Sequence, residues 1–436
     1  MATLNFFFPG GKYPQSYTPA IPGFVGFNPQ FGDLADLTTA TLISKSSTQI
    51  RFQLDNGLKL AITGSGFTFN AAGQATGGTI TKFDLFQNNG TTLVQSLTGL
   101  SLSLVLFEDA ADAYDPLGLE QWLLSRNDTI NGSAGNEDMY GFGGNDVLKG
   151  NGGDDYMEGG AGKDTYDGGS GFDEVSFDDA YWNANAFKGI VLDAAAKTVT
   201  DPYGNSETFA NIEAFRGTQF ADSMKGSSLG EAFIGLGGRD TIDGGGGFDF
   251  VGYQRDADFG GTAGVTVNLS TGVATDGFRK QDKLISIEGV RGTNFADSLT
   301  GSSVANILRG EGGNDLLAGA LGNDTLLGGG GKDAFLFNST LSASNVDLID
   351  DYSVADDTIR LENAIFTAIT GTGTLTAAQF VKNTGGTAAD SSDRIIYETD
   401  TGMLYYDSNG SASGGRIHFA TIDPNLALTF ADFFVV

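Results

Sequence analysis

Hydrophobic and polar positions follow a period of nine residues through the middle of the chain. An acid, or an amide in its place, recurs every ninth residue, and an apolar side chain follows it two positions later, as in Asp164-Thr165-Tyr166. One apolar position in a short segment between glycine-rich turns predicts a very short strand with one inward side chain. The pattern therefore predicts a parallel β solenoid with two strands in each coil. The positions in this register are Asp128, Glu137, Asp146, Asp155, Asp164 and Asp173 in a first block, Asp222, Glu231, Asp240 and Asp249 in a second, and Asp297, Asn306, Asp315, Asp324 and Asp333 in a third.

The turn before each acid approaches the pattern Gly-Gly-X-Gly-X-Asp, whose backbone angles favour glycine. With two turns in each coil, carboxylates 18 residues apart should stack on one side of the solenoid. Stacked carboxylates and turn carbonyls make an oxygen cage of the kind that Ca²⁺ prefers. The predicted ligand positions are Asp128, Asp146, Asp155, Asp164, Asp173, Asp222, Asp240, Asp249, Asp297, Asp315, Asp324 and Asp333, with the turn glycines Gly144, Gly153, Gly162, Gly171, Gly247, Gly313 and Gly331.

The pairs of acids 18 residues apart number four in the first block, two in the second and three in the third, so we expect up to about nine calcium ions. Pairs that involve Glu137, Glu231 or Asn306 are open to two interpretations, a calcium site or an empty turn. A longer repeat lies over the first, because residues 189–224 align without gaps with residues 264–299. Each unit of this repeat predicts a small β segment that leads into the next roll.

The two ends of the chain lack the nonapeptide. Alternating residues predict strands at 50–54, 58–62, 79–86 and from 92 to 107, then a short helix that starts at Asp115-Pro116 and plugs the first roll. The fold class is all-β, a parallel β-roll in three blocks flanked by an N-terminal antiparallel domain and a C-terminal β-rich secretion domain. The expected divisions are an extended aromatic arm (1–31), the N-terminal β domain (32–126), block 1 (127–180), a β segment with block 2 (181–255), a β segment with block 3 (256–340) and a C-terminal domain (341–436).

Charge narrows the classes of partner. The 436 residues carry a net charge of −30, and residues 1–126 hold 6 Lys or Arg against 9 Asp or Glu, so the rest of the chain holds almost all of the excess. The large net negative charge excludes nucleic acid as a partner. It also disfavours a compact state unless cations neutralise the acids. There is no cysteine, no basic-then-apolar secretory leader at Met1–Lys12, and no apolar run long enough for a transmembrane segment.

In these motifs the chain resembles the RTX (repeats-in-toxin) family, and from about residue 310 it resembles the C-terminal domain of serralysin-type RTX proteases. The resemblance implies calcium binding and export through a type I secretion exporter, with the final Ala431-Asp-Phe-Phe-Val-Val436 as an uncleaved signal. It does not extend to the protease, because the zinc motif His-Glu-X-X-His of that family needs two histidines and this chain has only His418. The implied localisation is extracellular or at a bacterial cell surface.

No catalytic constellation stands out. Gly226-Ser-Ser-Leu-Gly230 matches a nucleophile elbow, but the equivalent stretch of the next unit is Gly301-Ser-Ser-Val-Ala305, so we interpret it as repeat sequence. His418 is interpreted as an ordinary sheet histidine. Paired carboxylates would support glycoside hydrolysis, but nothing marks a working pair among the N-terminal acids. These acids are Asp33, Asp36, Glu108, Asp109, Asp112 and Asp115.

We therefore expect a secreted, non-catalytic calcium-binding protein that folds outside the cell, where calcium is abundant. Its expected role is that of a surface-layer, matrix or adhesive protein, with self-association through the aromatic arm or contact with a cell-surface polysaccharide as candidate interactions. The alternative is an extracellular polysaccharide-active enzyme or glycan-binding module that uses the repeats for export and folding.

Overall fold

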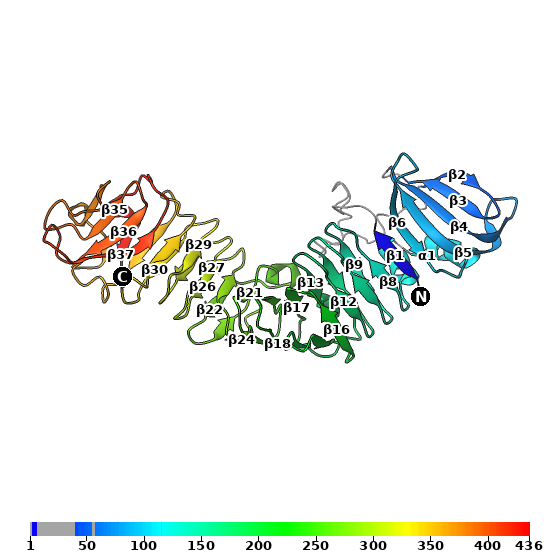
Figure 1. Cartoon of the computed structure of the whole chain (residues 1–436), viewed down its shortest axis with the longest axis horizontal. Coiled ribbons are helices and arrows are strands. Elements are labelled where there is room, and N and C mark those ends of the chain that lie inside the picture. Colours follow the sequence, from blue (N-terminus) through cyan, green and yellow to red (C-terminus); the bar gives the residue numbers. More distant parts are fainter. Residues whose placement is uncertain (1, 7–39, 55–56, 115) are drawn as a thin grey trace. The chain divides into compact units, whose positions relative to one another are not determined.

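The structure is a computed structural model that describes residues 2–6, 40–54, 57–114 and 116–436. The chain divides into two compact units, residues 1–217 and 218–436, and each is described by itself. Both consist mainly of short β strands stacked as successive rungs (Figure 1). The expected all-β class and the parallel β-roll are confirmed.

The first unit opens with an antiparallel sheet in the order β2-β3-β4-β5-β6-β1. Its last strand, β1, also pairs in parallel with β8, the first strand of the roll, so the sheet and the roll share one hydrogen-bonded edge. Residues 3–6, which we assigned to an extended arm, thus form part of the sheet, and the rest of that arm lies outside the described residues. The strands are β1 (Thr3–Phe6), β2 (Thr41–Lys45), β3 (Gln49–Gln53), β4 (Lys59–Phe69), β5 (Ala75–Phe86), β6 (Leu93–Thr98) and β7 (Leu102–Ser103).

One predicted strand is partly wrong. The segment from 92 to 107 alternates in sequence, but from residue 104 it forms helix α1 (Leu104–Ala113), whose N-cap Ser103 accepts a hydrogen bond from the Leu106 N–H. The leucines at 100, 102, 104 and 106 alternate as in a strand, but the buried Leu104, Phe107 and Ala110 recur every third residue, the spacing of one face of a helix. The expected capping helix is present as α2 (Pro116–Leu123), with Leu119 and Leu123 buried. Whether it plugs the roll stays a prediction.

The roll of the first unit has two faces of parallel strands. From β8 to β13 each strand pairs with the strand two places later, so consecutive nonapeptides alternate between the faces. One face is β8 (Thr129–Asn131), β10 (Val147–Lys149), β12 (Thr165–Asp167) and β16 (Ser206–Ala210), and the other is β9 (Asp138–Tyr140), β11 (Tyr156–Glu158), β13 (Glu174–Ser176) and β17 (Ala214–Arg216). The segment before β16 holds the 3-10 helix η2 (Asp178–Tyr181), β14 (Val191–Asp193) and β15 (Thr198–Thr200), and β15 pairs antiparallel with both β14 and β16.

The second unit repeats this plan and adds a C-terminal meander. On one face lie β18 (Ser223–Lys225), β20 (Thr241–Asp243), β24 (Gln281–Ile285), β23 (Val273–Thr275), β22 (Thr266–Asn268), β26 (Ser298–Thr300), β28 (Leu316–Ala318), β30 (Ala334–Phe337), β32 (Thr358–Leu361), β38 (Phe433–Val435) and β33 (Gly373–Thr374). On the other lie β19 (Ala232–Ile234), β21 (Phe250–Gly252), β25 (Gly289–Arg291), β27 (Ile307–Arg309), β29 (Thr325–Leu327), β31 (Asp347–Ile349), β37 (Arg416–Thr421), β36 (Met403–Asp407), β35 (Ile395–Glu398) and β34 (Phe380–Asn383). Short 3-10 helices η3 (Asp256–Phe259), η4 (Ala377–Gln379) and η5 (Phe430–Asp432) connect them.

The apolar position of every nonapeptide points into the roll. All fifteen of these side chains are at most 1% exposed, which confirms the predicted register. They are Ile130, Met139, Leu148, Met157, Tyr166, Val175, Met224, Phe233, Ile242, Val251, Leu299, Leu308, Leu317, Leu326 and Phe335.

Turn Gly159–Asp164 shows why the motif needs three glycines. Gly160 and Gly162 have φ of 80° and 154°, angles that side chains rarely adopt. A Cβ on Gly162 would overlap the carbonyl oxygen of Gly144 in the preceding coil, and a Cβ on Gly159 would overlap the Oδ2 of Asp164. The first glycine therefore leaves room for the carboxylate, and the other two shape the turn.

Candidate metal centre

The acids of the nonapeptides form a hydrogen-bonded ladder along each side of the roll. In all nine pairs, the backbone N–H of one member donates to a carboxylate oxygen, Oδ1, of the residue 18 positions later, at 2.7–2.9 Å. The fifteen side chains are between 0% and 5% exposed. The predicted stacking is thus present, and every predicted aspartate stands in a ladder.

A second ladder, which we did not predict, runs beside the first in the opposite direction. It uses the residue just before the acid, as where the Lys163 N–H donates to Asn145 Oδ1 at 2.9 Å and the Asn145 N–H to Asn127 Oδ1 at 2.8 Å. Asn136, Asp154, Asn314 and Asn323 accept in the same way. The recurrence of Asn or Asp in the fifth place of the turn was the available signal, because short amide and carboxylate side chains readily bond to nearby backbone.

The fifteen side chains divide into two classes. In the first class, four carboxylates and the amide of Asn306 accept hydrogen bonds from a Ser or Thr four residues earlier. For example, the Thr293 N–H and Oγ1–H donate to Asp297 at 2.6 and 3.0 Å. We call these the capped positions, and they are Glu137, Asp222, Glu231, Asp297 and Asn306.

In the second class the Oδ2 atom is buried and has no hydrogen-bond partner. We call these the open positions. They are Asp128, Asp146, Asp155, Asp164, Asp173, Asp240, Asp249, Asp315, Asp324 and Asp333. In nine of them, all but Asp128, the residue four places earlier has a positive φ in place of a capping hydroxyl. The same turn position therefore decides whether the protein itself satisfies the carboxylate.

Ten buried carboxylate oxygens without partners are a large uncompensated cost, since buried polar groups are otherwise hydrogen-bonded. A bound cation would remove this cost. In the residues that the structure describes, no three His, Cys, Asp or Glu side chains converge closely enough to hold a metal ion by themselves. A cation at an open position would therefore take backbone carbonyls as well, a donor set of oxygens alone, which fits Ca²⁺.

Comparison with protein families matches residues 124–141, 140–175, 230–258, 291–326 and 300–335 to the RTX calcium-binding nonapeptide repeat (4 copies). The chain carries RTX calcium-binding repeats. The matched segments contain all ten open positions together with the capped Glu137, Glu231, Asp297 and Asn306. They amount to less than a third of the chain, so the match describes the roll and not the regions outside it.

Two further comparisons add little to the RTX match. No curated protein sequence matches the chain. Among solved structures, the crystal structure of extracellular lipase LipA from Serratia marcescens matches at 16% identity and a TM-score of 0.19. The match covers 71% of this chain and 40% of the lipase chain, so the chain spans less than half the length of that lipase.

The RTX ladders do not stop at the last nonapeptide of each block. The Asp173 N–H donates to Glu213 at 3.0 Å, the Asp240 N–H to Asp282 at 3.0 Å and the Asp333 N–H to Asp357 at 2.9 Å. Glu288 and Asp347 continue the ladder from Asp249 and Asp324. Sequence reasoning missed these acids because loops of other lengths break the period of nine. Each nevertheless precedes a buried apolar residue by two, as the nonapeptide acids do.

Burial sets the charge state of the open carboxylates. It raises the pKa of Asp146 to about 8 and that of Asp155 to about 7, and neighbouring carboxylates add to the rise in both. The pKa of Asp315 is raised to about 7 in the same way. A cation favours the ionised form, so calcium binding to these groups should release protons.

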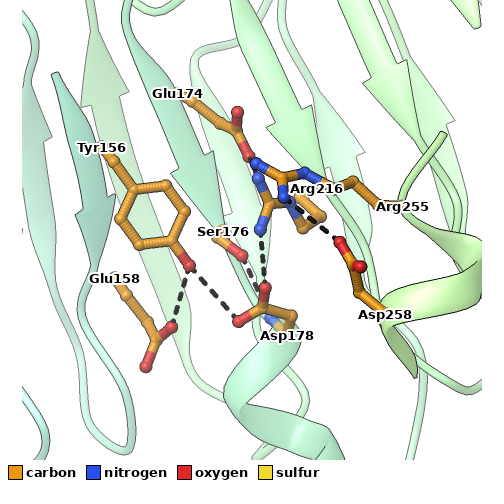
Figure 2. Close-up of polar contacts among 8 residues, drawn as sticks. All are labelled: Tyr156, Glu158, Glu174, Ser176, Asp178, Arg216, Arg255 and Asp258. Carbon is orange, nitrogen blue, oxygen red and sulfur yellow. Dashed lines mark hydrogen bonds and ion pairs between the residues drawn. The ribbon is translucent and has the colours of Figure 1, made fainter. Parts of the chain in front are cut away.

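Outside the ladders, a buried ion-pair cluster joins strands of the first unit (Figure 2). Arg216 pairs with Glu174 at 2.5 Å and with Asp178 at 2.8 Å. The Tyr156 hydroxyl donates to Glu158 at 3.1 Å and to Asp178 at 3.3 Å. Because Arg216 neutralises acids from β13 and η2, its role here is to hold the inserted segment against the roll.

The remaining candidates for chemistry are dispersed. His418 Nε2 lies 2.9 Å from the Ala420 carbonyl oxygen, and burial lowers the pKa of its ring. Glu108 accepts from the Ala75 N–H at 2.7 Å, while Asp109 and Asp112 are exposed. In the elbow-like sequence, Ser227 donates to Glu231, so it belongs to a capped turn. Asp33, Asp36 and Asp115 lie outside the described residues.

The two classes predict different effects for one substitution. Asp146→Asn keeps an acceptor for the Asp128 N–H but removes the open carboxylate, so we expect it to lower calcium-dependent stability. The loss should be about 2.7 kcal/mol when calcium stands at about 100 times the dissociation constant of one site. Asp297→Asn is the matched control, because Asn306 already fills a capped position in this chain. Urea unfolding at several calcium concentrations measures the stability of both variants. If the stability of the two variants depends equally on calcium, the division into open and capped positions is contradicted.

The raised pKa values also predict how pH acts without calcium. Because the folded carboxylates hold protons that the unfolded chain has lost, stability without calcium should fall as pH rises from about 4 through about 8. Saturating calcium should reverse the slope, since it binds the ionised form. Far-UV circular dichroism of calcium-stripped protein between about pH 5 and about pH 8 measures this. Calcium-stripped protein whose β signal grows with rising pH would contradict the prediction.

Proposed function

We propose that the chain is an extracellular structural protein whose roll folds when calcium binds at the open positions. The observation that carries this proposal is the set of ten buried carboxylate oxygens that no protein group satisfies. The RTX repeats support calcium as the cation, and they are typical of secreted bacterial proteins. In the residues that the structure describes, no helix is long and apolar enough to cross a membrane.

The energetics support folding that depends on the cation. A single site with calcium at 100 times its dissociation constant adds about 2.7 kcal/mol to stability. A few such sites would together exceed the roughly 5–15 kcal/mol by which an ordinary domain is stable. Where calcium is scarce, repulsion among the acids should keep the roll expanded, a state suited to passage through an exporter.

The position of the C-terminal strand is consistent with export of the chain before it folds. Its last strand, β38, lies between β32 and β33, and Phe433 and Val435 are buried in the folded unit. A type I exporter that recognises this segment would therefore have to bind it before the roll has folded. We propose that low calcium inside the cell keeps the segment accessible until export.

Exposed apolar side chains support a structural or adhesive role. On the turns before strands of one face of the second unit, Leu229 is 71% exposed, Val304 52% and Leu321 44%. In the first unit all five residues of β2 are exposed, and β2 pairs only with β3 among the described strands. Apolar turns and an open sheet edge are typical sites of association between chains.

The test is light scattering with negative-stain electron microscopy as calcium is raised from chelator to millimolar levels. We expect calcium to convert an expanded chain into a compact one that then forms ordered assemblies. The double variant Leu229→Ser/Val304→Ser should fold with calcium but assemble less. Its matched control is Ser228→Ala/Ser303→Ala, which changes exposed neighbours in the same two turns.

Two outcomes would overturn parts of the proposal. A chain that is equally compact in chelator and in calcium would contradict calcium-driven folding. A calcium-folded monomer at every concentration would contradict the assembly role. Retention of that monomer on immobilised glycan, or hydrolysis of a glycan, would then favour the binding-module or enzyme alternative.

A further inference from the structure

A second group of buried acids lies in the second unit, outside the nonapeptide register. It centres on the turn Asp276–Lys280 between β23 and β24. Asp276 Oδ1 accepts from the Phe278 N–H at 3.0 Å and from the Lys280 N–H at 2.5 Å. Its other oxygen, Oδ2, is buried and has no hydrogen-bond partner, and the residue as a whole is 0% exposed.

Asp256, on η3, meets the same turn. Its Oδ2 accepts from the Gly277 N–H at 2.8 Å, so the carboxylates of Asp256 and Asp276 both bind N–H groups of this one turn. Gly277 allows this approach, because a Cβ there would come within 2.8 Å of Asp256 Oδ2 and 3.3 Å of the Ala263 carbonyl oxygen. Asp256 is 1% exposed, and its Oδ1 is buried without a partner.

The surroundings add negative charge. Asp282 is 2% exposed, and it accepts from the Asp240 N–H at 3.0 Å and from the Tyr253 hydroxyl at 3.4 Å. Burial, with the charges of Asp276 and Asp282, raises the pKa of Asp256 to about 8. Lys280, whose charge lowers the pKa of Asp276, is itself exposed to solvent.

The equivalent turn of the first unit, 75 residues earlier, is satisfied by the protein itself. Asp201 stands where the second unit has Asp276, and its Oδ2 accepts from the Asn205 side-chain amide at 2.9 Å. The Tyr203 hydroxyl donates to Asp179, on the 3-10 helix η2. The second unit has Lys280 and Phe278 in place of Asn205 and Tyr203, so both donors are lost. Asp276 remains, and η3 brings Asp256 to the turn where η2 brings Asp179.

We propose that a hard cation, Ca²⁺ or one of similar size, binds between Asp256 Oδ1 and Asp276 Oδ2 as a site separate from the nonapeptide ladders. A divalent ion would replace the two donors that the first unit supplies and would neutralise two carboxylates that no cationic side chain pairs with in the described residues. As at the open positions, backbone oxygen would complete the donor set, and the Ala263 carbonyl oxygen beside Gly277 is one candidate.

This site is specific to the second unit. In the first unit the cation is replaced by hydrogen bonds, so one unit should hold one such ion and the other none. The difference gives a test that depends on the turn sequence and not on the nonapeptides.

Native mass spectrometry of the full chain in calcium, which counts bound ions, tests the site. Asp256→Asn/Asp276→Asn should hold one ion fewer than the wild type. Asp258→Asn, an exposed acid on the same 3-10 helix, is the matched control and should keep the full count. An unchanged count in the double variant would overturn the proposal.

A second variant guards against misfolding. Phe278→Tyr/Lys280→Asn copies the first unit's turn and supplies the missing donors, so it should lose the same ion while its thermal unfolding midpoint in calcium stays within a few degrees of the wild type. A full ion count in this variant would also overturn the proposal. If neither variant loses an ion, this second site is wrong but calcium-driven folding of the ladders is unaffected. If the wild type binds no calcium at all, the proposed function is contradicted.

Discussion

The fold depends on a row of buried carboxylates that the protein brings together but only partly satisfies. At nine of the ten open positions the acid accepts a hydrogen bond from the backbone of the preceding coil, and this bond fixes the stacking of the turns. At ten positions the other oxygen has no protein partner. Burying a charge in this way is unfavourable unless something compensates for it. The stability of the roll is therefore tied to the cation that we propose to bind there.

This constraint explains the composition of the repeats. The first glycine of a turn leaves space for the carboxylate, the next two adopt angles that most residues avoid, and the apolar residue after the acid fills the interior. Capped turns such as that of Asp297 use a hydroxyl in place of the strained angle, so they need no cation to satisfy their carboxylate. The roll thus combines turns whose polar groups the protein satisfies by itself with turns that we propose to bind an ion.

Sequence alone predicted the register, the two-faced roll and the pairing of acids 18 residues apart, because a strict period leaves few ways to stack the coils. It did not predict helix α1, since the leucines at 100, 102, 104 and 106 alternate as in a strand, although Leu104, Phe107 and Ala110 are buried on one helix face. It missed ladder acids such as Glu213 because inserted loops break the period. The capped class had a readable signal, the Ser or Thr four residues before the acid, but only the hydrogen bonds show what that residue does.

The most direct test of this account is the anomalous diffraction signal of crystals grown in calcium. We predict ions about 2.3–2.6 Å from the Oδ2 atoms of open positions such as Asp146 and Asp315, with backbone carbonyl oxygens as further ligands. The carboxylate of Asp297 should keep its bonds to Thr293. A roll that is folded in calcium, but whose open Oδ2 atoms contact only water or protein groups, would contradict the account.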